Sequence, residues 1–112
     1  MVGNSPTLAP EKVAEAMRTL LKWYKTHKKT MFPLQLAIEF HWRFERIHPF
    51  ANGNGRVGRM LMNKILISHD MVPVTIFAEN RRAYFNAIEK SIDGSFLPIY
   101  SFILGQYVKT LQ

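Results

Sequence analysis

Residues 48–59, HPFANGNGRVGR, gather residue types that could handle a phosphate group. His48 comes first, and an imidazole with a pKa near neutrality can take a proton from a hydroxyl that attacks phosphorus. Gly53 and Gly55 follow, and glycine lets a backbone curl and approach a ligand without obstruction from a Cβ atom. If a helix begins here, its first amides have no intrahelical partners and its dipole adds positive charge, so they can form an anion site.

Two arginines extend this glycine-rich run. Arg56 and Arg59 are three residues apart and therefore lie on one side of the first helical turn. Two guanidinium forks beside a glycine-lined helix start suit two phosphates in a row. Asn54 tolerates left-handed conformations and brings an amide donor, and Phe50 reads as an anchor with its ring in the core. From the residues alone, the loop is either a nucleotide or phosphate site or a merely structural loop.

The surrounding sequence predicts an all-α chain of about five helices with short connections, behind an irregular leader over residues 1–9. Pro10 and Pro33 fit the first positions of helices, and the residue before Pro49 is excluded from the α region, so the second helix must end near His48. Apolar residues on two stripes of that helix predict burial over much of its circumference. The predicted helices cover about residues 10–29, 33–48, 55–69, 80–91 and 96–111. Residues 72–77 are β-like in composition, but Pro73 favours an extended connector.

Bulk composition limits the classes of protein that fit. A chain of 112 residues suits one domain, 1–112, with one modest core. No apolar run has the length of a membrane span, and the first residues lack the basic flank and apolar core of a signal peptide, so a cytoplasmic location is the default expectation. There is no cysteine. The net charge of +7 favours a polyanionic partner: nucleotide phosphates, nucleic acid or an acidic protein. No clear recognition helix is visible, which argues against nucleic acid.

The pattern His48-Pro49-Phe50-x-x-Gly53-Asn54-Gly55-Arg56-x-x-Arg59 resembles the signature of the Fic family (filamentation induced by cAMP). The flanks FHWRFERIHPF, GRMLMNKIL and ENRRAYFNAIE are similar to the segments that border this motif in Fic proteins. The resemblance extends over roughly residues 8–104. It implies a compact helical core whose active-site loop feeds the N-terminus of a central helix. It also implies transfer of AMP from ATP to a Ser, Thr or Tyr hydroxyl of a target protein, with release of pyrophosphate.

The resemblance assigns roles to individual residues. It makes His48 the general base on the target hydroxyl. The predicted anion hole for the α- and β-phosphates consists of Gly53, Asn54 and Gly55, and the predicted ligands of the β- and γ-phosphates are Arg56 and Arg59. The helix that would border the nucleotide contains Tyr84 and Asn86, which are candidates for the vicinity of the adenosine. Such a transfer depends mainly on positioning and charge stabilisation, which a site made of donors plus one base provides.

Two departures from the family pattern bear on activity. Asn52 stands where the family usually has Asp or Glu, a carboxylate that helps hold the Mg²⁺ bridging the phosphates. An amide oxygen can ligate Mg²⁺ but lacks the charge, so Asn52 is a weak metal candidate, and slower catalysis or a preference for Mn²⁺ is open. The family also usually carries a further helix and a β-hairpin flap before the segment PTLAPEKVAEAM, and the flap holds the target by strand addition. We expect both to be absent from this chain.

Other functions remain open from the sequence. A catalytically weak nucleotide-binding domain, or a fragment of a larger regulator, is the alternative that Asn52 and the missing flap support. Kinase chemistry like that of the Doc toxin is disfavoured, because Gly55 and Arg56 stand where that motif contains Lys. Residues 75–80, TIFAEN, fit the pattern of the inhibitory helix that many Fic proteins carry. Pro73 and the β-like run argue that this match is a coincidence.

Overall fold

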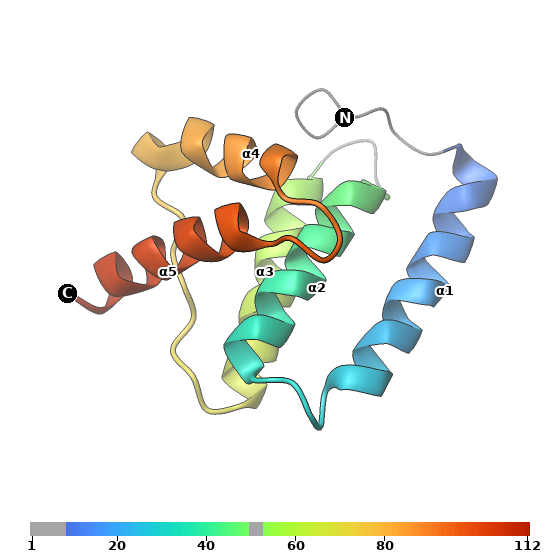
Figure 1. The fold of residues 1–112 in the computed structure, drawn as a ribbon, viewed down its shortest axis with the longest axis horizontal. Coiled ribbons are helices and arrows are strands. Elements are labelled where there is room, and N and C mark those ends of the chain that lie inside the picture. Colours follow the sequence, from blue (N-terminus) through green and yellow to red (C-terminus); the bar gives the residue numbers. More distant parts are fainter. Residues whose placement is uncertain (1–8, 50–52) are drawn as a thin grey trace.

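The computed structural model describes residues 9–49 and 53–112, and these form five α-helices (Figure 1). The helices are α1 (Pro10–His27), α2 (Pro33–Ile47), α3 (Asn54–Ser68), α4 (Arg81–Lys90) and α5 (Leu97–Leu111), with a short 3-10 turn, η1 (Ala78–Asn80), before α4. The predicted all-α class and the predicted helices are confirmed, and the largest shift in a boundary is at the end of α1. None of the helices in the described part of the chain is long and apolar enough to cross a membrane.

Proline starts three of these helices. Pro10 and Pro33 are the first residues of α1 and α2, and Pro98 is the second residue of α5. Proline lacks the amide hydrogen that would stay unpaired at a helix start, and its fixed φ is already helical. At Gly94 the chain reverses between α4 and α5 with a φ of 85°. This left-handed conformation suits glycine, which forms the turn that follows α4.

Helix α2 is the centre of the fold. Ten of its fifteen residues are buried, which confirms the prediction of burial over much of its circumference. In Figure 1, α2 and α3 lie side by side in the middle, α1 flanks α2, and the pair α4–α5 covers the opposite side. The core draws on all of these helices; its fully buried large side chains include Leu36, Ile38, Phe44, Met62, Leu66, Tyr84, Ile88, Ile99 and Ile103.

Arg43 of α2 contacts side chains of the segments packed beside this helix. Its guanidinium lies 4.2 Å from the ring centre of Trp23 on α1 and 5.2 Å from that of Phe96. The same group pairs with Glu39 at 3.3 Å and with Asp93 at 3.1 Å. A planar guanidinium can stack on rings and donate at its edges at once, so this single side chain joins α1 and the α4–α5 connection to α2.

The connector between α3 and α4 is extended over residues 71–77, as predicted. Side chains satisfy its backbone groups. The Asn63 amide nitrogen donates to the Val74 carbonyl at 3.0 Å, and the Val74 amide donates back to the Asn63 oxygen at 2.8 Å. The Phe77 amide donates to Gln106 of α5 at 2.9 Å. Because these side chains take the place of a partner strand, a β-like composition does not produce a strand here.

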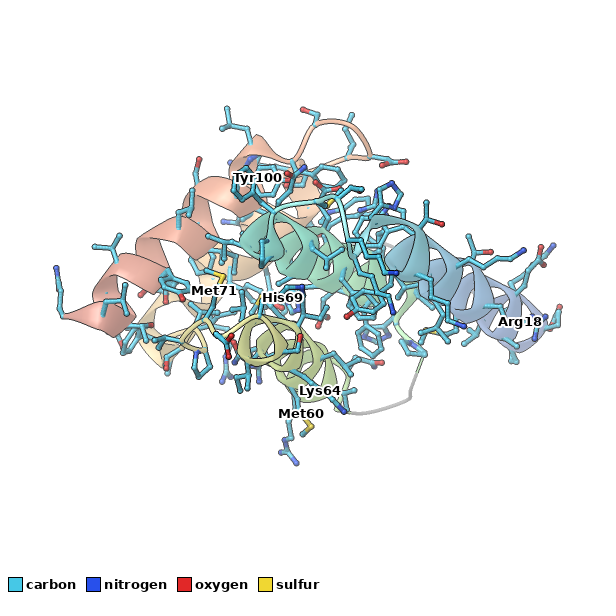
Figure 2. All side chains as sticks on the ribbon, turned by 90° about the horizontal axis from the view of Figure 1, so that it is seen from below. Arg18, Met60, Lys64, His69, Met71 and Tyr100 are labelled. Carbon is cyan, nitrogen blue, oxygen red and sulfur yellow. The ribbon has the colours of Figure 1, made fainter. Side chains whose placement is uncertain are left out.

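Three apolar residues lie further from the core than their spacing predicts. Leu21 of α1 and Leu111 of α5 recur at helical spacing with core residues but are 50% and 58% exposed. Leu111 lies in the last turn of α5, beyond the elements that cover the rest of that helix. Met60 of α3 projects away from the bundle (Figure 2). Met62 is fully buried. Residues two apart point to opposite sides of a helix, so only one of these two methionines can join the core.

Candidate active site

His48 caps the C-terminal end of α2. Its amide donates to the Phe44 carbonyl at 3.0 Å, which closes the helix, and its φ of 53° and ψ of 60° turn the chain into the left-handed region. The following Pro49 disfavours the right-handed helical conformation at this position, which accounts for the abrupt end of α2. The His48 side chain is half-buried. Burial lowers the pKa of this imidazole below its ordinary value of 6.5, so the ring is neutral at pH 7 and can accept a proton.

Gly53 begins α3. It adopts a φ of 79°, and a Cβ built on it would meet nothing within 4 Å. The demand for glycine here is therefore conformational, and the space beside the residue is open. The Val57 amide makes the first backbone hydrogen bond of α3, to the Gly53 carbonyl at 3.0 Å. The amides of Gly55 and Arg56 precede this bond, in the positions where a helix offers donors to an anion.

The two predicted phosphate-binding arginines differ in their surroundings. Arg56 is exposed, and Arg59, one turn further along the same face of α3, is half-buried. The Arg59 guanidinium folds back over the helix start. A Cβ atom built on Gly55 would lie only 3.0 Å from the Arg59 Nη1 atom, which shows how closely the guanidinium approaches this glycine. Gly55 therefore makes room for a guanidinium as well as for the backbone. Together the helix start and Arg59 concentrate positive charge at the end of α3 that neighbours His48.

A buried polar cluster lies beneath this end of α3. His41 and Glu45 of α2 are 0% and 2% exposed, and Tyr84 of α4 is 1% exposed. The His41 Nε2 atom and the Tyr84 hydroxyl are 2.6 Å apart. Glu45 lies against the backbone of Gly58, where a Cβ atom would overlap the Glu45 Oε1 atom. Glycine at this position therefore lets α2 and α3 approach with a carboxyl group between them.

Burial dominates the ionisation of this cluster. It lowers the pKa of His41 to about 4, raises the pKa of Glu45 to about 7, and raises the pKa of Tyr84. The charge of Arg59 opposes the effect of burial on Glu45 and Tyr84, so the guanidinium lies within electrostatic reach of the cluster. Among the described residues, two buried side-chain atoms of this cluster, His41 Nδ1 and Glu45 Oε1, have no hydrogen-bond partner. These are the unexplained polar atoms of the site.

The remaining predicted site residues are placed as follows. Asn54 is the first residue of α3 and is 4% exposed, so its side chain points inward while its backbone belongs to the helix start. The residue with the left-handed backbone conformation is Gly53, directly before α3, and Asn54 is already helical. On α4, Tyr84 points into the core and Asn86 lies on the exposed side. Two residues that sequence reasoning placed together near an adenosine therefore face opposite sides of one helix.

Two predictions fall on residues 50–52, which lie outside the described residues: Phe50 as an anchor and Asn52 as a metal ligand. The described residues contain no cluster of three or more His, Cys, Asp or Glu that could hold a metal. The segment TIFAEN is extended up to Phe77 and then forms η1. Its Glu79 pairs with Lys109 of α5 at 2.7 Å. This segment does not form an inhibitory helix.

The sequence patterns did not identify His41, Glu45 or Gly58 as site residues. A signal for Glu45 was present, because this carboxyl group shares a helix face with Ile38 and Trp42 and so lies in an apolar stripe. For Gly58 the signal was a glycine inside a helix, which costs about 1 kcal/mol relative to alanine and therefore calls for an explanation. The partner that each of these residues meets depends on how α2, α3 and α4 pack.

The comparisons with known proteins agree with this geometry. The model of the Fic/DOC family matches residues 2–66, more than half of the chain. This chain belongs to the Fic/DOC family. The resemblance inferred from the motif in residues 48–59 is thereby confirmed, and with it the Fic-type helical core.

Named relatives and solved structures extend the comparison. A probable protein adenylyltransferase of Aquifex aeolicus is 34% identical over 99 residues, and protein adenylyltransferase Fic of Drosophila melanogaster is 32% identical over 112 residues. These matches cover 88% and 99% of this chain but only 30% and 23% of the relatives.

Two solved structures share the fold of this chain. A Fic domain containing signaling protein from Bacteroides thetaiotaomicron superposes with a TM-score of 0.85 at 26% identity, over 94% of this chain and 45% of that one. Fic-1 from C. elegans gives 0.81 at 26% identity, over 100% of this chain and 34% of that one. The helical arrangement around α2 and α3 is therefore the arrangement of solved Fic domains.

Proposed function

We propose that this chain is the catalytic core of a protein adenylyltransferase that moves AMP from ATP to a Ser, Thr or Tyr hydroxyl of a target protein. The hydroxyl oxygen attacks the α-phosphorus, the bond from that phosphorus to the bridging β-phosphate oxygen breaks, and pyrophosphate leaves. His48 takes the proton of the attacking hydroxyl. The names of the relatives support the reaction, and the positions of the described residues support these roles.

One observation carries the proposal: the C-terminal end of α2, which His48 caps, and the N-terminal end of α3 lie at the same end of the α2–α3 pair. Amides of Gly55 and Arg56 suit the α- and β-phosphate oxygens, and Arg59 suits the terminal phosphates. These donors are fixed before substrate arrives, so they stabilise the charge that develops on the phosphates without reorganising. A base whose pKa lies below neutrality is ready to accept a proton at pH 7.

The nucleotide is proposed to bind as its Mg²⁺ complex, with Mn²⁺ as an alternative. The described donors at the start of α3 are amides and guanidinium groups, which fit the phosphate oxygens. Asn52 is the proposed protein ligand to the metal, on the basis of its place in the motif alone. The metal would offset phosphate charge, and the roles of His48 and Arg59 do not depend on it. The target protein and the cytoplasmic location stay predictions from the sequence.

The test is transfer of label from ATP carrying ³²P at the α-phosphate, to the chain itself and to proteins of a cell lysate. We expect transfer by the wild-type chain, loss of transfer in His48→Ala and an increase in Asn52→Asp. His69→Ala is the matched control, because His69 lies just beyond the opposite end of α3 and binds the Ile65 carbonyl at 2.9 Å. That variant should transfer label like the wild type.

Other outcomes separate the alternatives. Binding of ATP without transfer, in both wild type and Asn52→Asp, would contradict the enzyme and support a nucleotide-binding module. Label transferred only from the γ-phosphate would indicate kinase chemistry and a reversed nucleotide. Transfer that persists in His48→Ala would remove this imidazole from the role of general base.

A further inference from the structure

Tyr84 is too deeply buried to present a ring face to a nucleotide. Its side chain is 1% exposed, and its ring centre lies 5.2 Å from that of Phe85 and 5.8 Å from that of Phe102. Such packing fixes the ring between α4 and α5. The part of Tyr84 that remains to be explained is therefore its hydroxyl group, which points toward α2 and α3.

The Tyr84 hydroxyl contacts His41 of α2. The 2.6 Å separation between His41 Nε2 and the Tyr84 oxygen is that of a good hydrogen bond. Burial keeps both partners uncharged at pH 7, since it lowers the pKa of His41 to about 4 and raises that of Tyr84. A neutral pair of this kind holds the hydroxyl in one direction without a buried charge.

The second neighbour of Tyr84 is Arg59 of α3. Through its charge and a side-chain hydrogen bond, Arg59 lowers the pKa of Tyr84 against the larger effect of burial. Arg59 and Tyr84 also line a cavity of about 90 Å³ between α3, α4 and the connector. On its other side the guanidinium covers Gly55. Arg59 is thus confined between the start of its own helix and the Tyr84 hydroxyl.

We propose that Tyr84 is a positioning residue for Arg59: its hydroxyl, held by His41, orients the guanidinium at the phosphate-binding end of α3. The inference rests on the proposed function, in which Arg59 binds the β- and γ-phosphates. An arginine side chain loses several rotatable bonds when it binds a ligand, and orienting it beforehand reduces that loss. Tyr84 itself does not touch the nucleotide, so its effect is limited to the phosphates that Arg59 holds.

The experiment compares the affinities of the chain for ATP and for AMP by titration calorimetry. AMP lacks the β- and γ-phosphates and does not report on Arg59. We expect Tyr84→Phe to weaken ATP binding roughly fivefold and to leave AMP binding unchanged. Tyr107→Phe is the matched control, because its hydroxyl donates to the Val72 carbonyl at 2.8 Å, away from the site. That variant should leave both affinities unchanged.

A double-mutant cycle with Arg59→Ala separates positioning from general damage. In the Arg59→Ala background, Tyr84→Phe should cause no further loss of ATP affinity. A loss of the same size in both backgrounds, or equal losses for ATP and AMP, would overturn the inference and indicate that Tyr84 only supports packing. His41→Leu removes the group that holds the hydroxyl while Tyr84 stays in place, and it should give the same ATP-selective loss. If Tyr84→Phe does not fold, His41→Leu serves as the test variant in its place.

The cycle also distinguishes this inference from the proposed function. If Arg59→Ala weakens ATP binding but Tyr84→Phe and His41→Leu do not, Arg59 binds phosphate without help and only the inference fails. If Arg59→Ala leaves the preference of the chain for ATP over AMP unchanged, the phosphate-binding role of Arg59 fails, and the proposed function loses its phosphate site.

Discussion

The buried carboxyl group of Glu45 should make the folded chain less stable as pH rises. Its pKa is raised from 4.5 to about 7, first because burial disfavours the charged form. Between these two values the folded chain keeps a proton that the unfolded chain has released. The unfolded state then binds fewer protons than the folded state, so the free energy of unfolding falls as pH rises. The loss begins above pH 4.5 and is complete above about pH 7.

The change Glu45→Gln isolates this effect. Glutamine has nearly the shape of a protonated glutamic acid and does not titrate. Each pH unit in the window corresponds to about 1.4 kcal/mol, so by about pH 8 the wild-type chain should have lost about 3 kcal/mol that the variant keeps. Near pH 4.5 the two proteins should be similar in stability. At higher pH the variant should be the more stable of the two.

Urea denaturation of both proteins between pH 4.5 and about pH 8 measures the difference. His41, whose pKa is lowered to about 4, titrates in both proteins, and its contribution cancels in the comparison. Glu15→Gln, at an exposed position on α1, is the control and should show no pH-dependent difference beyond about 0.5 kcal/mol. A stability difference for Glu45→Gln that stays constant with pH would refute the argument from burial.

Three further substitutions test the packing around the site, each by urea denaturation. Gly58→Ala should destabilise the fold by about 1–3 kcal/mol, because the new Cβ would overlap Glu45 Oε1 and lie 3.1 Å from Phe44 Cδ1. Unchanged stability would mean that α2 and α3 can move apart without a loss of free energy. Gly53→Ala should be less stable by about 1–2 kcal/mol from its φ of 79° alone, and a stabilised variant would contradict the left-handed conformation. Asn63→Ala leaves two connector groups unpaired and should lose about 1–3 kcal/mol, whereas a neutral effect would show that water replaces this side chain.

The helices could be predicted because their signals are local. Pro10 and Pro33 start α1 and α2, and Pro49 ends α2 next to His48, each through the conformations that a proline ring excludes. The Fic-like motif in residues 48–59 likewise marks the start of α3. These features depend on neighbours along the chain, and the structure places them within two residues of the predicted positions.

The burial of individual side chains could not be predicted in the same way. Helical spacing shows which residues share a face, but the exposure of Leu111 depends on whether another element covers the end of α5. Tyr84 was placed near an adenosine because its helix borders the site, yet its orientation depends on His41, which is distant in the sequence. Glu45 was visible as a carboxyl group in an apolar stripe, but its neighbour Gly58 became apparent only from the contact between α2 and α3.

The proposed phosphate-binding end of the fold belongs to a single antiparallel helix pair, α2 and α3 (Figure 1). Contacts between neighbours in sequence close small loops and form early in folding. The His41–Tyr84 contact joins α2 to α4 and needs most of the chain. We therefore expect a folding order in which the packing of α2 on α3 forms first and the orientation of Arg59 comes last. Hydrogen exchange should then report later protection at Tyr84 than at Val57, so the chain would acquire its fold before it acquires a fully ordered site.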